Sequence, residues 1–305
     1  MKAAIDIGTN TALLLIAEIT DGGVQVLREE QRIPRLGQGV DESKMLHPDS
    51  MNRVLQNLKE YKTIVQEYPA VKQVVVTATS AVRDAGNREH FISKIKEETG
   101  FEVRLLSGDE EAQYTFQGAL TEVTISEGHS AFVLDIGGGS TELAYGSTDS
   151  LSQYHSFDMG SVRFKERFLT NNPPKPDEIE ACKNEINRLL NRKKFEIHPN
   201  ATAIGVAGTA TSLAAIILNL KEYDMSLING FAITLAALSE VVIFLSSKTY
   251  DEILRVCPKI LKGREDILLP GLLIMESFMK FYELEEIKVS TGGIRHGAIL
   301  LSEKD

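Results

Sequence analysis

The sequence predicts an α/β protein made of two domains of related structure, and three observations support this prediction. A chain of 305 residues is long for one hydrophobic core and suits two domains of ordinary size. Apolar runs of strand character alternate with segments of helical spacing, which is typical of mixed α/β layers. The motif D-I-G at Asp6 recurs as D-I-G-G-G at Asp135, which indicates a duplicated domain.

The first half of the chain is predicted to begin with a meander of three strands, with a turn at Asp21-Gly22-Gly23. Pro48 fits the first turn of a helix. Asn87 is the expected N-cap of a second helix, and Gly100 its stop. The predicted strands are 2–7, 12–19, 24–33, 71–77 and 101–106. The predicted helices are 48–67, 87–99 and 108–120.

The polar stretch from Thr121 to Ser130 is the predicted boundary, which gives domains of residues 1–125 and 126–305. The second half opens with glycine-rich strands and becomes mostly helical towards its end. Its strands are predicted within 131–147 and at 151–158, 201–207 and 286–291. Its helices are predicted at 177–193, over most of 209–282, and at 294–301.

Composition and charge exclude several classes of protein. The net charge of −10 and the pI of about 5.3 argue against bulk binding of nucleic acid, which needs a basic face. No apolar run is long enough for a membrane span, and Asp6 interrupts any signal peptide at the start. Cys182 and Cys257 have no metal-type spacing, so we expect a reduced, cytoplasmic location.

Two pairs of similar segments support the duplication. Asp6 to Thr11 resembles Asp135 to Thr141, and the two Asp numbers differ by 129. The run T-A-T-S begins at Thr77 and again at Thr209, and these numbers differ by 132. Two related domains would face each other across a cleft, with a phosphate chain and its metal between the two Asp-led turns.

The glycine run Gly137-Gly138-Gly139 is the strongest chemical signal. Consecutive glycines cost backbone entropy, and they allow backbone amides to approach an anion closely. Asp135 and Glu142 flank the run, and a magnesium ion can bridge such carboxylates to a phosphate. A metal–phosphate site is therefore predicted, and a glycine-rich hairpin without a ligand is the alternative.

A cluster of acids opens the helix that follows Ser107. Asp109, Glu110 and Glu111 suit the positive end of a helix dipole, which is a purely structural explanation. One of them could instead act as a general base that orients or deprotonates water for attack on a phosphoryl group. Helical geometry alone does not choose among the three.

Five arginines could supply phosphate contacts, because the guanidinium fork matches phosphate oxygens. Arg83 follows the first T-A-T-S run. The arginines that stand close to a glycine are Arg32, Arg35, Arg163 and Arg295. For each of them alone, ordinary surface solvation is the alternative. Gly208-Thr209 lies between a strand and a helix and could place amides near a second phosphate. The sequence has no P-loop and no G-x-S-x-G elbow.

Taken in order along the chain, these motifs resemble the exopolyphosphatase / guanosine pentaphosphate phosphohydrolase (Ppx/GppA) family, a branch of the superfamily of actin, sugar kinases and heat-shock ATPases. The resemblance covers essentially the whole chain. The motifs that carry it are D-I-G-T-N-T (6–11), R-L-G-Q-G (35–39), T-A-T-S-A-V-R (77–83), S-G-D-E-E-A (107–112), D-I-G-G-G-S-T-E-L (135–143), M-G-S-V-R (159–163), G-T-A-T-S-L (208–213), G-R-E-D-I (263–267) and G-I-R-H-G-A-I-L (293–300).

The resemblance implies two ribonuclease-H-like domains around a cleft, with the last helix, about 294–302, packing back on the first domain. It also implies that Glu111 is the catalytic base. Mg²⁺, or Mn²⁺ in its place, is expected to bind through Asp6, Asp135 and Glu142. The residues expected to hold substrate phosphates are Gly8, Thr9, Asn10, Arg83, Gly137, Gly138, Gly139, Ser140, Thr141, Gly208 and Thr209. Further basic contacts are expected from Arg35, Arg163 and Arg295.

The expected function is magnesium-dependent hydrolysis of terminal phosphoanhydride bonds of inorganic polyphosphate. Longer family members carry a C-terminal helical extension that this sequence lacks, so short chains are the favoured substrate. His296 stands where the family commonly has an acid. The alternatives are hydrolysis of guanosine pentaphosphate, phosphotransfer between polyphosphate and a nucleotide, and an alarmone sensor without activity. Apolar helices within 234–282 could form a homodimer face or pack in the core.

Overall fold

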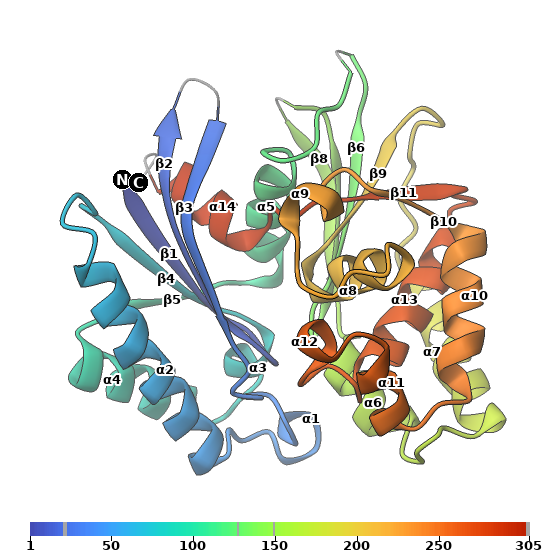
Figure 1. The fold of residues 1–305 in the computed structure, drawn as a ribbon, viewed down its shortest axis with the longest axis horizontal. Helices are drawn as coiled ribbons and strands as arrows, with labels where there is room; N and C mark the ends of the chain where they lie inside the picture. The colour runs from blue at the N-terminus through green and yellow to red at the C-terminus, as the bar shows by residue number, and fades with distance from the viewer. Residues whose placement is uncertain (21–22, 127, 149, 303–305) are drawn as a thin grey trace. The chain divides into compact units, whose positions relative to one another are not determined.

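The computed structural model describes residues 1–20, 23–126, 128–148 and 150–302. The chain folds as two compact units (Figure 1). Unit 1 comprises Met1–Thr121 and Gly292–Asp305, and unit 2 comprises Glu122–Thr291. In both units a mixed β-sheet is flanked by helices, as the sequence predicts.

Unit 1 is built on a five-stranded sheet in the order β3-β2-β1-β4-β5. The first three strands form the predicted antiparallel meander, β4 pairs with β1 in parallel, and β5 pairs with β4 in parallel. The turn predicted at 21–23 involves Asp21 and Gly22, which lie outside the described residues. The strands are β1 (Lys2–Ile7), β2 (Ala12–Thr20), β3 (Gly23–Arg32), β4 (Val74–Ala78) and β5 (Val103–Leu105).

Side chains alternate across the central strand β1 and so feed two cores. Ala3, Ile5 and Ile7 pack in the core on the side of α2 and α4, whereas Ala4 packs in the core on the side of α5 and α14 (Figure 1). Asp6 has the parity of Ala4, so it points to the face that α5 covers. The helices are α1 (Val40–Ser43), α2 (Pro48–Gln66), α3 (Ser80–Arg83), α4 (Arg88–Thr99), α5 (Gly108–Ala119) and α14 (Ile294–Leu301).

The last helix, α14, packs on α5 through backbone-to-backbone contacts that only glycine permits. A Cβ added at Gly118 would collide with the carbonyl of Gly293, and one added at Gly297 would collide with the carbonyl of Tyr114. Residues 294–301 therefore belong to unit 1, although they follow unit 2 in the sequence.

Unit 2 is built on a six-stranded sheet in the order β10-β11-β9-β6-β7-β8. Its strands are β6 (Ala131–Ile136), β7 (Thr141–Gly146), β8 (Leu151–Phe157), β9 (Thr202–Val206), β10 (Ala232–Thr234) and β11 (Glu286–Val289). Its helices are α6 (Ser161–Phe168), α7 (Pro176–Arg192), α8 (Ala207–Ile217), α9 (Met225–Ile228), α10 (Leu235–Ser246), α11 (Tyr250–Val256), α12 (Pro258–Leu261) and α13 (Leu268–Phe281). None of the helices in the described ranges is long and apolar enough to cross a bilayer.

The register of the two sheets supports the duplication and corrects one alignment. Asp6 pairs with Leu13 and Thr77 on its neighbouring strands, and Asp135 pairs with Glu142 and Val206. Each residue of the second set has a number 129 higher than its equivalent in the first set. The T-A-T-S alignment does not share this offset and is displaced along the chain. In unit 1 the run begins within β4, but in unit 2 it lies inside α8.

Three further details differ from the prediction. Helix α6 and the short strand β10 are not predicted, because each is too short to show a periodic pattern. Asn87 makes no capping hydrogen bond and instead holds the backbone of Leu46 through its side-chain amide.

Nearly all of α13 is buried in the core of unit 2, so its apolar surface serves internal packing. A homodimer stays a prediction.

His296 on α14 leads to a prediction about pH. It is 1% exposed, and this burial, aided by the neighbouring charge of Arg295, lowers the pKa of His296 to about 3. The unfolded chain binds this proton below about pH 6.5. Between the folded and the unfolded pKa of His296 the unfolded state therefore binds more protons than the folded state, so stability falls as the pH drops from about 6.5 towards about 3.

When the pH is lowered from about 7 to about 5, we expect the wild type to lose about 2 kcal/mol more stability than His296→Gln. The difference grows by about 1.4 kcal/mol for each pH unit below the unfolded pKa of His296. Urea unfolding at the two pH values measures this difference. His90→Gln, at an exposed position, is the control and should behave like the wild type. Equal losses in the wild type and His296→Gln would contradict the assignment.

Candidate functional site

The two Asp-led turns are closed by equivalent backbone hydrogen bonds. In the first turn (Gly8–Thr11) the amide of Gly8 donates to the carbonyl of Thr11 at 2.9 Å. In the second turn (Gly137–Ser140) the amide of Gly137 donates to the carbonyl of Ser140 at 3.0 Å. Each turn connects two antiparallel strands, β1 to β2 and β6 to β7, directly after the strand that carries the Asp.

The second turn is held by the start of α6, which we call the second brace (Gly160–Arg163). The amides of Ser161 and Val162 donate to the carbonyls of Gly137 and Gly138 at 2.9 and 2.8 Å. The Nε of Arg163 donates to the carbonyl of Gly139 at 2.6 Å. With its carbonyls fixed on one side, the turn is ready to present amides to an anion on the other. Within the described chain, the amides of residues 138–140 donate to no other residue.

The first turn has an equivalent support, the first brace (Arg35–Gly37), which comes from a loop rather than a helix. The amide of Arg35 donates to the carbonyl of Asn10 at 3.1 Å, and the amide of Gly37 donates to the carbonyl of Thr9 at 2.8 Å. A Cβ at Gly37 would collide with the side chain of Thr9. The motifs R-L-G-Q-G and M-G-S-V-R thus share one structural task, which is to support a turn.

Gly160 provides a direct test of the second brace. A Cβ at this position would lie 2.5 Å from the carbonyl oxygen of Gly138, and the neighbouring atoms are backbone that cannot move aside. We expect Gly160→Ala to displace the turn and to lower kcat/KM about 10- to 100-fold, because misplacing catalytic groups by about 1 Å has effects of this size. Gly86→Ala is the control, because its Cβ would meet only ordinary contacts. Full activity of Gly160→Ala would show that the turn needs no such support.

A pair of buried carboxylates lies in unit 2. Asp135 and Glu142 are direct cross-strand partners, so their side chains share one face of the sheet. They are 5% and 2% exposed, and the hydroxyl of Ser156 donates to Glu142 Oε1 at 2.6 Å. Two adjacent carboxylates in a buried site are the oxygen donors that Mg²⁺ prefers, and the ion takes its remaining ligands from phosphate and water. The donor set therefore fits Mg²⁺.

Unit 1 has only half of this pair. At the position equivalent to Glu142 it carries Leu13, so the residue across the strand from Asp6 is apolar. Asp6 Oδ1 accepts a hydrogen bond from the hydroxyl of Thr77 at 3.0 Å. Within the described ranges, no group of three or more His, Cys, Asp or Glu residues is arranged to hold a metal ion.

The structure separates the three acids at the start of α5. Asp109 is exposed. Glu110 closes a capping box with Ser107. The hydrogen bond from the Ser107 amide, together with those from its hydroxyl and from Arg104, lowers the pKa of Glu110, although burial acts in the opposite direction. Glu111 is 5% exposed and points inward. It is therefore the acid that takes no part in the capping box and is sheltered from bulk water.

Arg83 fixes the position of Glu111. Its Nη1 donates to Glu111 Oε2 at 2.9 Å and to the carbonyl of Leu106 at 3.0 Å. The ion pair ties the end of α3 to the start of α5. The sequence motifs T-A-T-S-A-V-R and S-G-D-E-E-A are thus brought into direct contact within unit 1.

Other predicted phosphate contacts are used inside the fold. Arg295 pairs with Glu29 and donates to the carbonyl of Leu14 at 2.9 Å. The hydroxyl of Thr141 donates to the carbonyl of Met159 at 2.7 Å. The side chain of Thr209 lies within α8, close to Gly271 of α13. For these residues the structure provides a packing role.

The guanidinium of Arg264 lies against Gly208, where a Cβ would collide with it. This brings the motif G-R-E-D-I to the start of α8. Sequence reasoning also missed the roles of Gly37, Gly160 and Ser156. The two glycines stand in motifs quoted above, and their supporting role would not be visible without the contacts. Ser156 carries no sequence signal.

Comparisons with known proteins agree with this architecture. The profile of the Ppx/GppA phosphatase family matches residues 15–305. Exopolyphosphatase 2 of Mycobacterium tuberculosis is 32% identical over 295 residues, which is 93% of this chain and 91% of that protein. A crystal structure of an exopolyphosphatase from Cytophaga hutchinsonii has a TM-score of 0.88 at 28% identity, covering 99% of this chain and 97% of that chain.

A bifunctional 3-dehydroquinate synthase/phosphatase of Fusobacterium nucleatum is 31% identical over 98% of this chain. The chain spans only 46% of the length of that relative. The similarity therefore concerns one part of the larger protein.

Proposed function

Because the chain belongs to the Ppx/GppA phosphatase family, we propose that it hydrolyses the terminal phosphoanhydride bond of inorganic polyphosphate. The chain is a phosphoanhydride hydrolase, and the polymer substrate is the proposal. The observation that supports it most is the buried Glu111 held by Arg83, in a chain that also carries two braced turns suited to phosphate.

In the proposed reaction, Glu111 accepts a proton from the water that attacks the terminal phosphorus in line with the leaving oxygen. Arg83 keeps the carboxylate in place. The amides of Gly138 and Gly139 offer hydrogen bonds to phosphate oxygens, whose charge must be stabilised in the transition state. Mg²⁺, or Mn²⁺ in its place, would be held by Asp135 and Glu142 and would neutralise further phosphate charge.

The net charge of −10 repels a long polyanion at a distance. Capture then depends on local amides, arginines and the metal ion, which favours short chains.

The two cysteines, Cys182 and Cys257, are free and buried, which supports a reducing, cytoplasmic location.

The test is phosphate release from polyphosphate chains of defined length. Guanosine pentaphosphate is offered in the same reaction as a competitor. Faster turnover of short polyphosphate than of long polyphosphate or guanosine pentaphosphate supports the proposal. Preferred turnover of guanosine pentaphosphate would assign the alternative substrate. Formation of a nucleoside triphosphate without free phosphate would indicate phosphotransfer, and binding without turnover would indicate a sensor.

A further inference from the structure

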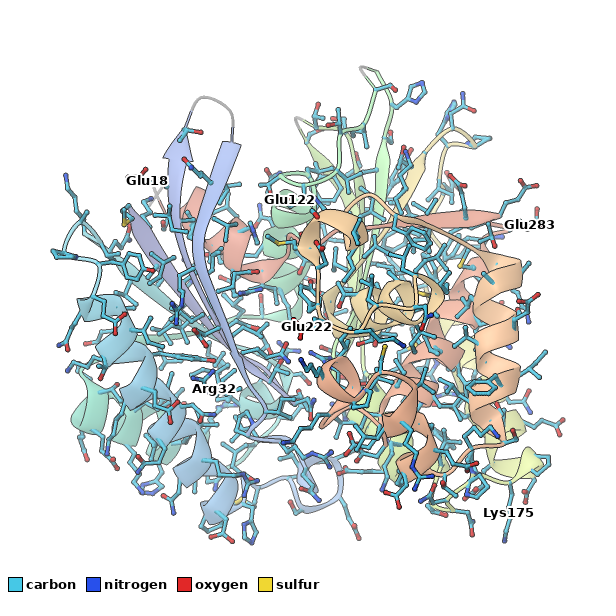
Figure 2. The ribbon with its side chains drawn as sticks, viewed as in Figure 1. Glu18, Arg32, Glu122, Lys175, Glu222 and Glu283 are labelled. Carbon is cyan, nitrogen blue, oxygen red and sulfur yellow. The ribbon has the colours of Figure 1, made fainter. Side chains whose placement is uncertain are left out.

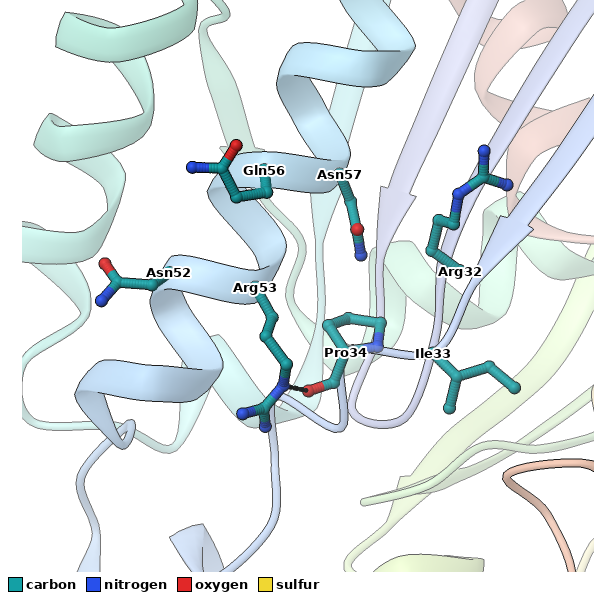
Figure 3. Close-up of a pocket in the computed structure, with 7 residues that line it drawn as sticks. All are labelled: Arg32, Ile33, Pro34, Asn52, Arg53, Gln56 and Asn57. Atoms are coloured by element: carbon teal, nitrogen blue, oxygen red, sulfur yellow. Dashed lines mark hydrogen bonds between the residues drawn. The ribbon is translucent and has the colours of Figure 1, made fainter.

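A recess of about 340 Å³ lies in unit 1 between the end of β3 and α2 (Figure 3). Its lining contains two arginines and three carboxamides. The lining residues are Arg32, Ile33, Pro34, Asn52, Arg53, Gln56 and Asn57. The recess adjoins Pro34, the residue that directly precedes the first brace.

The two arginines of the recess have different partners. Arg32, labelled in Figure 2, donates to Glu30 at 2.9 Å and to Glu60 at 3.1 Å, so its charge is balanced. Arg53 forms no ion pair with any carboxylate in the parts of the chain that are described. A surface arginine without an acidic partner is free to place its donors on neutral acceptors.

Arg53 uses these donors on the backbone and on a nearby hydroxyl. Its Nε donates to the carbonyl of Pro34 at 2.8 Å, which is the dashed line in Figure 3, and its Nη2 donates to the hydroxyl of Ser50 at 2.7 Å. A hydrogen bond from a charged donor is stronger than one between neutral groups. Proline has no amide hydrogen, so a hydrogen bond can hold this residue only through its carbonyl.

The backbone directly after Pro34 is strained. Arg35 has a φ of 51°, in the left-handed region that a residue with a side chain adopts only when its surroundings impose it. From this conformation the amides of Arg35 and Gly37 reach the carbonyls of Asn10 and Thr9. A fixed carbonyl at Pro34 is therefore an anchor from which the strained first brace can meet the turn.

We propose that Arg53 is a positioning residue for the first turn, acting by holding the Pro34 carbonyl and, through it, the first brace. Among the described residues, the hydrogen bonds of Arg53 go to Pro34 and Ser50 and not to either turn, so its effect would be transmitted along the backbone from residue 34 to residue 37. The catalytic part of this inference rests on the proposed function, because it assumes that the first turn binds substrate phosphate. The structural part does not depend on that assumption.

The test replaces Arg53 by Ala and follows hydrogen exchange of the amides of Arg35 and Gly37. We expect their protection to fall about tenfold, because a hydrogen bond from a charged group is among the stronger ones in a protein and its loss lets the brace open more often. Arg53→Lys keeps a charged donor for the Pro34 carbonyl and should restore most of the protection. Gln56→Ala, on the same helix and the same recess, is the matched control and should change neither amide.

The second measurement is steady-state hydrolysis of short polyphosphate. In Arg53→Ala we expect kcat/KM to fall about 3- to 10-fold, with rescue by Arg53→Lys. The melting temperature should fall by only a few degrees, because a tenfold loss of protection corresponds to about 1.4 kcal/mol. Unchanged protection of both amides would overturn the proposal. Lost protection with unchanged kcat/KM would also overturn it. Exchange can be measured even if polyphosphate is not the substrate, so failure of the two proposals can be distinguished.

Discussion

Glu111→Gln is expected to lower kcat for phosphate release about 10²- to 10⁴-fold, with little change in KM. The amide is nearly isosteric with the carboxylate but cannot accept a proton from water. Its oxygen can still accept the hydrogen bond from Arg83, so the geometry of the pair should survive. Single-turnover release of phosphate from polyphosphate of defined length measures the chemical step directly.

Asp109→Asn is the matched control, because Asp109 is on the same helical turn but exposed. It should leave kcat unchanged. A Glu111→Gln protein with the melting temperature and the rate of the wild type would remove Glu111 from the reaction. If Asp109→Asn were the slow variant instead, the assignment among the three acids would be wrong.

The sequence predicts the turns well because their signal is local. In D-I-G-G-G-S-T, the apolar strand, the carboxylate and the glycines are adjacent, and the first turn repeats the order. The strand order of the two sheets follows the same repeat, with one constant offset between equivalent positions. The alignment of the two T-A-T-S runs was wrong, although their sequences are identical. The second run lies in α8 and not at the position equivalent to the first, which begins in β4.

The features that the sequence could not predict depend on contacts between distant segments. The role of Gly160 arises from its contact with Gly138, which lies much earlier in the chain, before β7 and β8. In the same way, Glu111 cannot be told from Glu110 until the capping box is seen to engage Glu110. The resemblance to a family names Glu111, and the structure adds a physical reason.

The paired carboxylates of unit 2 lead to the second large effect. Glu142→Gln and Asp135→Asn should each raise the Mg²⁺ concentration needed for half-maximal activity about 100-fold or more, since partners that merely orient metal ligands are already worth about 10- to 100-fold. Removing the metal with a chelator should stop the wild-type reaction, and added Mg²⁺ should restore it.

The same pair predicts opposite signs for stability with and without the metal. Like charges directly opposite in a sheet are destabilising by about 0.2–1 kcal/mol, so without metal Glu142→Gln should melt at or above the temperature of the wild type. With Mg²⁺ the order should reverse, because an ion that binds only the folded state raises the melting temperature, and the variant binds it weakly. Glu240→Gln, an exposed carboxylate on α10, should behave like the wild type in both conditions. A wild-type melting temperature that does not respond to Mg²⁺, or an equal rise in Glu142→Gln, would rule out metal binding by this pair, because the predicted reversal requires that the two buried carboxylates bind the cation.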